Sequence, residues 1–76
     1  MTLTVHDLPG LVRIRRMVDG GELRRVRERA ALTQEELAEV CHVTKSCVSR
    51  WESGEIYPTS TNARQLVEIV NVLEAS

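Results

Sequence analysis

The stretch that decides the fold is Thr33-Gln-Glu-Glu-Leu-Ala-Glu-Val-Cys-His-Val-Thr-Lys-Ser-Cys-Val-Ser-Arg-Trp-Glu-Ser-Gly54. At its start, Thr33 can cap a helix, and Glu36 three residues later completes the pattern of a capping box. Small and apolar residues then recur at helical spacing, so one face of the segment can be buried. The pattern predicts a helix over 34–41.

A second helix is predicted a short turn later in the same stretch. Thr44 is another N-cap candidate, and Val48 and Trp51 lie three residues apart, which gives the helix an apolar side. Gly54 is typical of the position just after a helix end. We therefore expect a helix over 45–53, and two short helices joined by a tight turn form a helix-turn-helix.

Several spaced residues between 22 and 58 agree with one known pattern. They are Leu32, Thr33, Gln34, Leu37, Ala38, Val43, Val48, Ser49, Trp51, Glu52, Gly54 and Pro58. In this combination they resemble the DNA-binding domain of Cro and lambdoid-type phage repressors, the xenobiotic-response-element-type family of transcriptional regulators. The resemblance implies an all-α fold, a compact lambda-repressor-like helix-turn-helix domain of four to five helices. In this chain the domain would carry an extra N-terminal helix.

The outward side of the second helix is the predicted site for reading bases. If Val48 and Trp51 point inward, four polar side chains point outward: Lys45, Ser46, Ser49 and Arg50. In the resembling family these positions enter the major groove, where lysine and arginine donate to guanine O6 and N7, arginine in a two-bond fork. The alternative is that they are ordinary solvated polar residues.

The resemblance also implies contacts to the DNA backbone, for which the candidates are Gln34, Thr44, Cys47, Ser53 and Tyr57. Many relatives are basic in the loop 54–58, whereas this chain has Glu55 and Ile56 there. Backbone amides and the Tyr57 hydroxyl would then remain as the donors of this loop.

Two more positions carry structural expectations from the resemblance. The family pairs an arginine at the position of Arg27 with a glutamate at the position of Glu52, and both are present here. His42 occupies a turn position that usually holds glycine and requires a left-handed backbone, which histidine tolerates better than most residues. We expect a strained turn residue there, not a catalytic or metal-binding one.

The N-terminal part, residues 1–21, is predicted to form an arm and a short helix ahead of the DNA-binding domain at 22–76. Residues 1–7 are expected to be extended or frayed, and Leu8-Pro9-Gly10 to interrupt the chain. Helical spacing of apolar residues predicts a helix over 11–18. That helix either covers a patch of the core or forms a basic arm on the DNA backbone.

Two further helices are predicted on either side of the motif. One covers 22–31, with three residues pointing inward: Leu23, Val26 and Ala30. The other covers about 61–74 and has two apolar stripes. One stripe of this last helix closes the core. The other stripe would be exposed on a monomer and is therefore a candidate dimer surface, formed by Ile69, Val72 and Leu73.

Length and charge point to one small domain with an uneven distribution of charge. The chain has 76 residues and a formal net charge of −1, which is unusual for a nucleic-acid binder. Most of its basic residues are arginines that precede residue 33, and such polarisation favours one surface that faces phosphate. No secretory signal or membrane span is recognisable, so a cytoplasmic, nucleoid-associated location is expected.

The two cysteines, Cys41 and Cys47, are too few to predict a disulfide framework. Combined with His42 and the distant His6, they fit no common zinc spacing. Neither a metal nor another cofactor is expected.

The leading functional hypothesis is a sequence-specific, double-stranded DNA-binding transcriptional regulator, Cro-like or repressor-like, that binds a two-fold operator as a homodimer. The chain is almost entirely DNA-binding domain, which is typical of small phage-like repressors. The alternatives are an antitoxin that grips a toxin through its C-terminal or N-terminal helix, a phage recombination-directionality factor, and a protein-interaction module without DNA binding. An enzyme is not expected, because no glycine-rich phosphate loop, paired carboxylates or nucleophile–base spacing is present.

Overall fold

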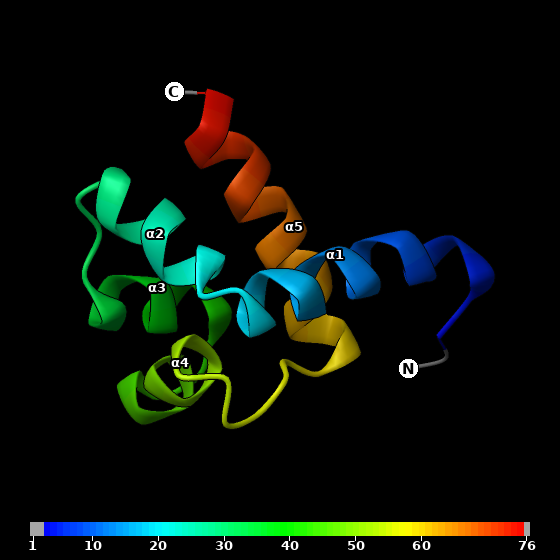
Figure 1. The fold of residues 1–76 in the computed structure, drawn as a ribbon, viewed down its shortest axis with the longest axis horizontal. Coiled ribbons are helices and arrows are strands. Elements are labelled where there is room, and N and C mark those ends of the chain that lie inside the picture. Colours follow the sequence, from blue (N-terminus) through cyan, green and yellow to red (C-terminus); the bar gives the residue numbers. More distant parts are fainter. Residues whose placement is uncertain (1–2, 76) are drawn as a thin grey trace.

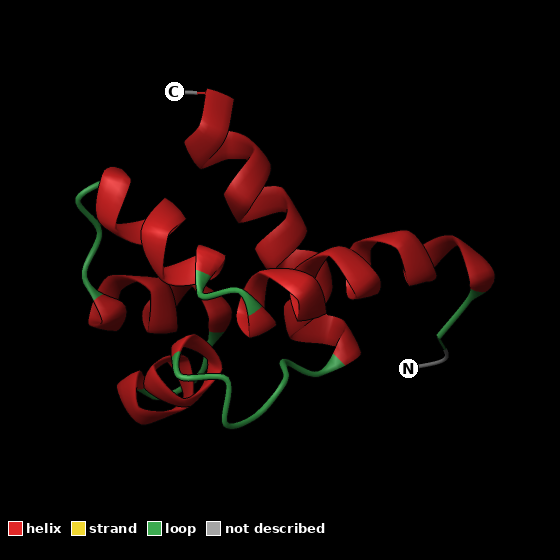
Figure 2. Ribbon diagram, in the orientation of Figure 1, coloured by secondary structure: helices red, strands yellow, loops and turns green. Residues whose placement is uncertain are grey.

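Helices account for most of residues 3–75, the part of the chain that the computed structural model describes (Figure 1). No strand occurs within this range (Figure 2). The elements in chain order are the short 3-10 helix η1 (Val5–Asp7), α1 (Leu8–Asp19), α2 (Glu22–Arg29), α3 (Gln34–Cys41), α4 (Lys45–Glu52) and α5 (Ser60–Ala75). The predicted all-α fold of four to five helices is therefore confirmed.

A single apolar core joins all five α-helices. Figure 1 shows α1 crossing α5, while α3 packs on α4 and α2 lies against α1 and α5. Trp51 from α4 is the largest fully buried side chain, and it is surrounded by aliphatic residues. The buried set is Leu11, Ile14, Met17, Val18, Leu23, Val26, Leu37, Ala38, Cys41, Val48, Trp51, Ala63, Leu66 and Val70.

The predicted caps fix both helices of the helix-turn-helix. The Thr33 hydroxyl accepts from the Glu36 amide at 3.0 Å, and the Glu36 carboxylate accepts from the Thr33 amide at 2.9 Å, so the capping box is confirmed. The Thr44 hydroxyl accepts from the Cys47 amide at 3.1 Å. Each bond satisfies an N–H group that the first turn of a helix leaves without a partner.

The turn between α3 and α4 has the predicted left-handed residue. His42 has φ 57° and ψ 42°, and its side chain is exposed. The next residue, Val43, donates its amide to the Ala38 carbonyl at 3.0 Å and so closes the end of α3. Gly54, also predicted to follow a helix end, has φ 78°.

The N-terminal expectation was wrong in two respects. Leu8-Pro9-Gly10 does not interrupt the chain but forms the first turn of α1, where a missing proline N–H costs nothing. Gly10 fits there because an added Cβ would lie 3.1 Å from Val67 Cγ2 on α5. Residues 5–7 are not extended but form η1, and the Thr4 amide donates to Asp7 at 2.9 Å. Residues 1–2 lie outside the described range.

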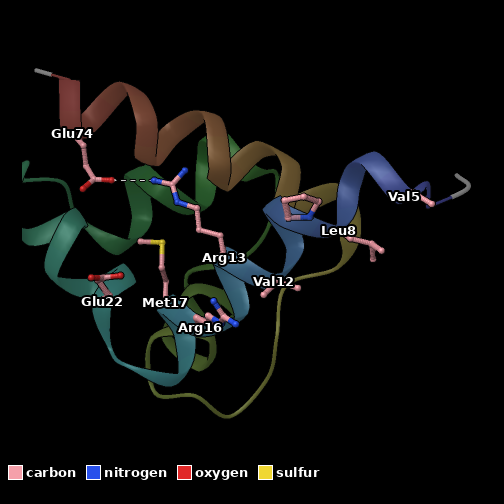
Figure 3. A pocket seen from close by; sticks show the side chains of 9 residues that line it. Val5, Leu8, Val12, Arg13, Arg16, Met17, Glu22 and Glu74 are labelled. Atoms are coloured by element: carbon pink, nitrogen blue, oxygen red, sulfur yellow. Dashed lines mark hydrogen bonds and ion pairs between the residues drawn. The ribbon is translucent and has the colours of Figure 1, made fainter.

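α1 is a full member of the core, because four of its residues are buried. An open hollow lies on the outer side of α1, and the buried Met17 lies beneath it. The other residues that line the hollow in Figure 3 include Val5, Leu8, Val12, Arg13, Arg16, Glu22 and Glu74. Arg13 crosses to α5, where it donates to Asn71 at 2.8 Å and to Glu74 at 3.2 Å. These bonds reinforce the apolar packing of α1 on α5.

The bounds of three other helices differ from prediction. α4 ends at Glu52, one residue earlier than expected. α2 ends at Arg29, not at residue 31, because Ala31 adopts a left-handed backbone with φ 58°. Ala30, predicted to point inward, is exposed for the same reason. α5 is one continuous helix that begins at Ser60, one residue earlier than expected, and ends at Ala75.

Acid is expected to weaken the attachment of η1 to α5. Arg64 donates two hydrogen bonds to Asp7, at 2.9 and 2.5 Å, and mainly through them lowers the pKa of Asp7 from 3.8 to about 2. Because the folded-state pKa is lowered, the pair stabilises the fold above pH 3.8, and this contribution is lost as the pH falls toward about 2.

Asp7→Asn should therefore have a lower melting temperature than the wild type near neutral pH. On acidification, its melting temperature should fall less than that of the wild type. Thermal unfolding followed by circular dichroism between neutral and strongly acidic pH tests this. Glu28→Gln removes an exposed pair with Arg24 and serves as the control. Equal acid sensitivity of Asp7→Asn and the wild type would contradict the prediction.

Candidate nucleic-acid interface

α4 has one buried side and one open side. Val48 and Trp51 are 0% and 1% exposed and belong to the core. The four predicted base-reading residues are all exposed: Lys45, Ser46, Ser49 and Arg50. Because the helical period is 3.6 residues, these positions fall on the opposite side from the buried pair. The structure thus brings the four side chains together on an uncovered helix face.

The beginnings of α3 and α4 carry two of the predicted backbone-contacting residues. Thr44 is exposed at the N-cap of α4. Gln34, at the first turn of α3, donates its side-chain amide to Glu52 at 2.9 Å and so braces the end of α4. Lys45 lies 3.6 Å from the exposed Glu35 carboxylate, a solvated pair that leaves the ammonium accessible.

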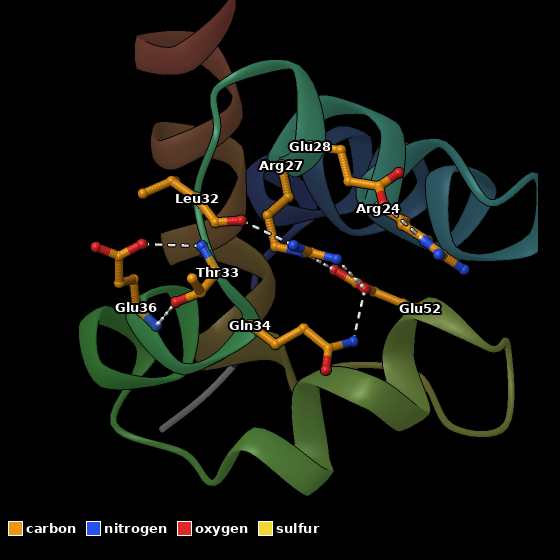
Figure 4. Close-up of polar contacts among 8 residues, drawn as sticks. All are labelled: Arg24, Arg27, Glu28, Leu32, Thr33, Gln34, Glu36 and Glu52. Carbon is orange, nitrogen blue, oxygen red and sulfur yellow. Dashed lines mark hydrogen bonds and ion pairs between the residues drawn. The ribbon is translucent and has the colours of Figure 1, made fainter.

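A largely buried ion pair holds α2 against the end of α4 (Figure 4). Arg27 donates to both oxygens of Glu52, at 2.6 and 3.0 Å, and to the Leu32 carbonyl at 2.7 Å. The side chains of Arg27 and Glu52 are only 11% and 3% exposed. The Glu52 carboxylate raises the pKa of the Arg27 guanidinium above its usual value. Together with Gln34, the pair fixes the angle at which α4 is presented.

The remaining predicted backbone contacts are used within the protein. The Ser53 hydroxyl donates to the Arg50 carbonyl at 3.1 Å. The Tyr57 hydroxyl donates to Asp19 on α1 at 2.7 Å, and this bond is the main cause of a raised pKa for Tyr57. Cys47 is half-buried against the core. A contact of these three residues with the DNA backbone stays a prediction.

Contacts between α1 or α5 and the motif were not predicted from the sequence. Asn62 donates to the Cys41 carbonyl at 3.1 Å, which ties the end of α3 to the start of α5. Arg15 lies over the Tyr57 ring, with its Cζ 5.5 Å from the ring centroid. Each contact joins residues more than twenty positions apart, and no local pattern marks them.

The predicted dimer stripe is less exposed than expected. Ile69 and Leu73 pack partly against the core, whereas Val72 is 66% exposed. Val40 on α3 is 58% exposed and lines the same shallow apolar hollow, together with Leu37. The surface that remains therefore spans α3 and α5.

Both cysteines are free and form no disulfide. Cys41 is buried, which raises the pKa of its thiol, and Cys47 is half-buried and also free. Within residues 3–75, no cluster of three histidine, cysteine or acidic residues has the arrangement of a metal site.

Among the described helices, none combines the length and the apolar character needed to cross a membrane.

Comparison with known proteins agrees with the geometry of the motif. A family described as a helix-turn-helix domain matches residues 20–76. The HTH-type transcriptional activator BcrR of Enterococcus faecalis is 35% identical over 51 residues, which is 67% of this chain and 25% of that protein. The chain thus spans about a quarter of the length of this relative. No solved structure matches the chain.

Proposed function

Because the chain belongs to the helix-turn-helix domain family, we propose that it is a sequence-specific regulator of transcription that binds double-stranded DNA. The observation that carries the proposal is the exposed side of α4, which presents Lys45, Ser46, Ser49 and Arg50 while Val48 and Trp51 anchor the helix in the core. The relative's name, a transcriptional activator, supports the same class of activity.

The mechanism is binding in the major groove of B-DNA, without covalent chemistry. Arg50 donates two hydrogen bonds to guanine O6 and N7, and Lys45 donates to the same kind of acceptor at the beginning of the helix. Thr44 and Gln34 contact phosphates where α3 and α4 begin, and the Arg27–Glu52 pair keeps α4 at a fixed angle. Occupancy of a promoter then changes transcription.

We extend the proposal to a homodimer on a two-fold operator with half-sites about 34 Å apart, one turn of DNA. The surface that fits a second copy is the apolar patch of Val40, Ile69, Val72 and Leu73. Exposed valines on two neighbouring helices favour association, because removing their surface from water is favourable.

A second candidate function is a protein-interaction module, such as an antitoxin. Two observations favour it: the net charge of −1 and the acidic Glu55 just after α4, both unusual for a DNA binder. The apolar residues Val5 of η1 and Leu8 and Val12 of α1 would then contact the partner.

Selection of bound duplexes from a random DNA library distinguishes the two functions. We expect the full chain to enrich one sequence with two-fold symmetry, and the logarithm of its affinity to fall linearly with the logarithm of salt concentration. A parallel selection without protein is the control. No enrichment over that control, even at low salt, would reject DNA binding and leave the interaction module.

A further inference from the structure

The loop that follows α4, residues 53–58, has few donors left for a phosphate. The Glu55 and Ile56 amides both donate to the Arg50 carbonyl, at 2.9 and 3.4 Å. The Gly54 amide donates to the Trp51 carbonyl at 3.2 Å, and the Tyr57 hydroxyl is bound to Asp19. The loop has no basic side chain. A phosphate beside this loop therefore needs a cation from another element.

α1 places a cation at this loop. Arg15 and Asp19 are one helical turn apart and hold Tyr57 from two sides, Arg15 over the ring and Asp19 at the hydroxyl. Gly54 is close as well, since an added Cβ would lie 4.0 Å from the Val18 carbonyl. The loop after α4 and the C-terminal end of α1 thus form one continuous edge.

The Arg15 guanidinium remains available to an anion. It is exposed, and within residues 3–75 it forms no ion pair. A guanidinium that lies over a ring keeps the N–H groups in its own plane free to donate. Ordering on Tyr57 also reduces the side-chain entropy that a phosphate contact would otherwise cost.

We propose that Arg15, held on the Tyr57 ring beside the end of α4, binds a phosphate of the DNA backbone, so that α1 forms part of the DNA interface. The inference rests on the proposed function. Arg15 fixes the position of α4 on the duplex without reading bases, because a phosphate carries no sequence information. It supplies the charge that the acidic loop lacks.

Salt dependence of binding separates a phosphate contact from a merely structural one. We expect Arg15→Gln to weaken binding about 3- to 10-fold at low salt and to reduce the slope of log affinity against log salt by about 1. The loss should be equal for the selected duplex and for an unrelated duplex of the same length. Arg15→Lys should keep most of the slope. Fluorescence anisotropy of the two labelled duplexes over a salt series measures both quantities.

One variant serves as a control. Arg29→Gln removes an exposed arginine at the far end of α2, beside Glu74, and should leave affinity and slope unchanged.

Different results would reject the phosphate contact of Arg15 and the proposed DNA-binding function. If the wild type binds the selected duplex and Arg15→Gln has the wild-type affinity and slope, the phosphate contact is overturned alone. A loss of affinity in Arg15→Gln without a change of slope also overturns the phosphate contact. It would show that Arg15 only supports the Tyr57 loop. If the wild type binds neither duplex, both proposals fall.

Discussion

Replacement of Arg27 by methionine is expected to lower the free energy of unfolding by about 3–5 kcal/mol. The Glu52 side chain is 3% exposed, so the substitution leaves a buried carboxylate without its cation. The Leu32 carbonyl also loses the Arg27 donor, and Gln34 still donates to Glu52. Urea unfolding followed by circular dichroism measures the change.

Two further variants show whether the loss of stability in Arg27→Met comes from burial of the unpaired Glu52 carboxylate. Arg27→Met combined with Glu52→Leu removes both charges, and this double variant should recover much of the lost stability. Arg24→Met removes an exposed i, i+4 pair with Glu28 and should cost no more than about 0.5 kcal/mol. A loss below about 1 kcal/mol in Arg27→Met would show that Glu52 is effectively solvated in solution.

Replacement of Arg50 by alanine is expected to weaken binding to the selected duplex by roughly 10- to 100-fold, the cost of one bidentate base contact. Binding to an unrelated duplex should change much less, because that binding rests on phosphate contacts. The fold should persist, since the side chain is exposed and the bonds from Ser53 and Glu55 go to the Arg50 backbone carbonyl.

Competition between the two duplexes, measured by fluorescence anisotropy, gives the specificity ratio directly. Arg29→Ala is the control, because it removes another exposed arginine, one that lines a hollow beside Glu74 of α5. Equal weakening of both duplexes by Arg50→Ala would mean that this arginine contacts phosphate and reads no base.

The helix-turn-helix was predictable because its signals are local. Thr33 with Glu36, and Thr44 with the Cys47 amide, act within three residues, so the sequence carries each contact in full. The same holds for the outward positions of α4, which follow from the helical period once Val48 and Trp51 are placed inward. The strained turn at His42 was expected from the resemblance and has the expected backbone.

The ends of the chain were harder to predict because tertiary contacts decide them. Gly10 is a helix breaker in isolation, yet close packing against Val67 stabilises it inside α1. Residues 5–7 are ordered by Asp7, whose partner Arg64 lies 57 positions away. Tyr57 was expected to offer its hydroxyl to DNA, but no pattern in the sequence connects it with Asp19 on α1.

The division of α4 into two sides also bears on how such a protein diversifies. Its inner residues, Val48 and Trp51, serve stability, and its outer residues make almost no contact within the monomer apart from the solvated Lys45–Glu35 pair. Substitutions at 46, 49 and 50 should therefore be nearly neutral for folding. A descendant could acquire a new target sequence through a few mutations without passing through unstable intermediates, so evolvability is built into one helix.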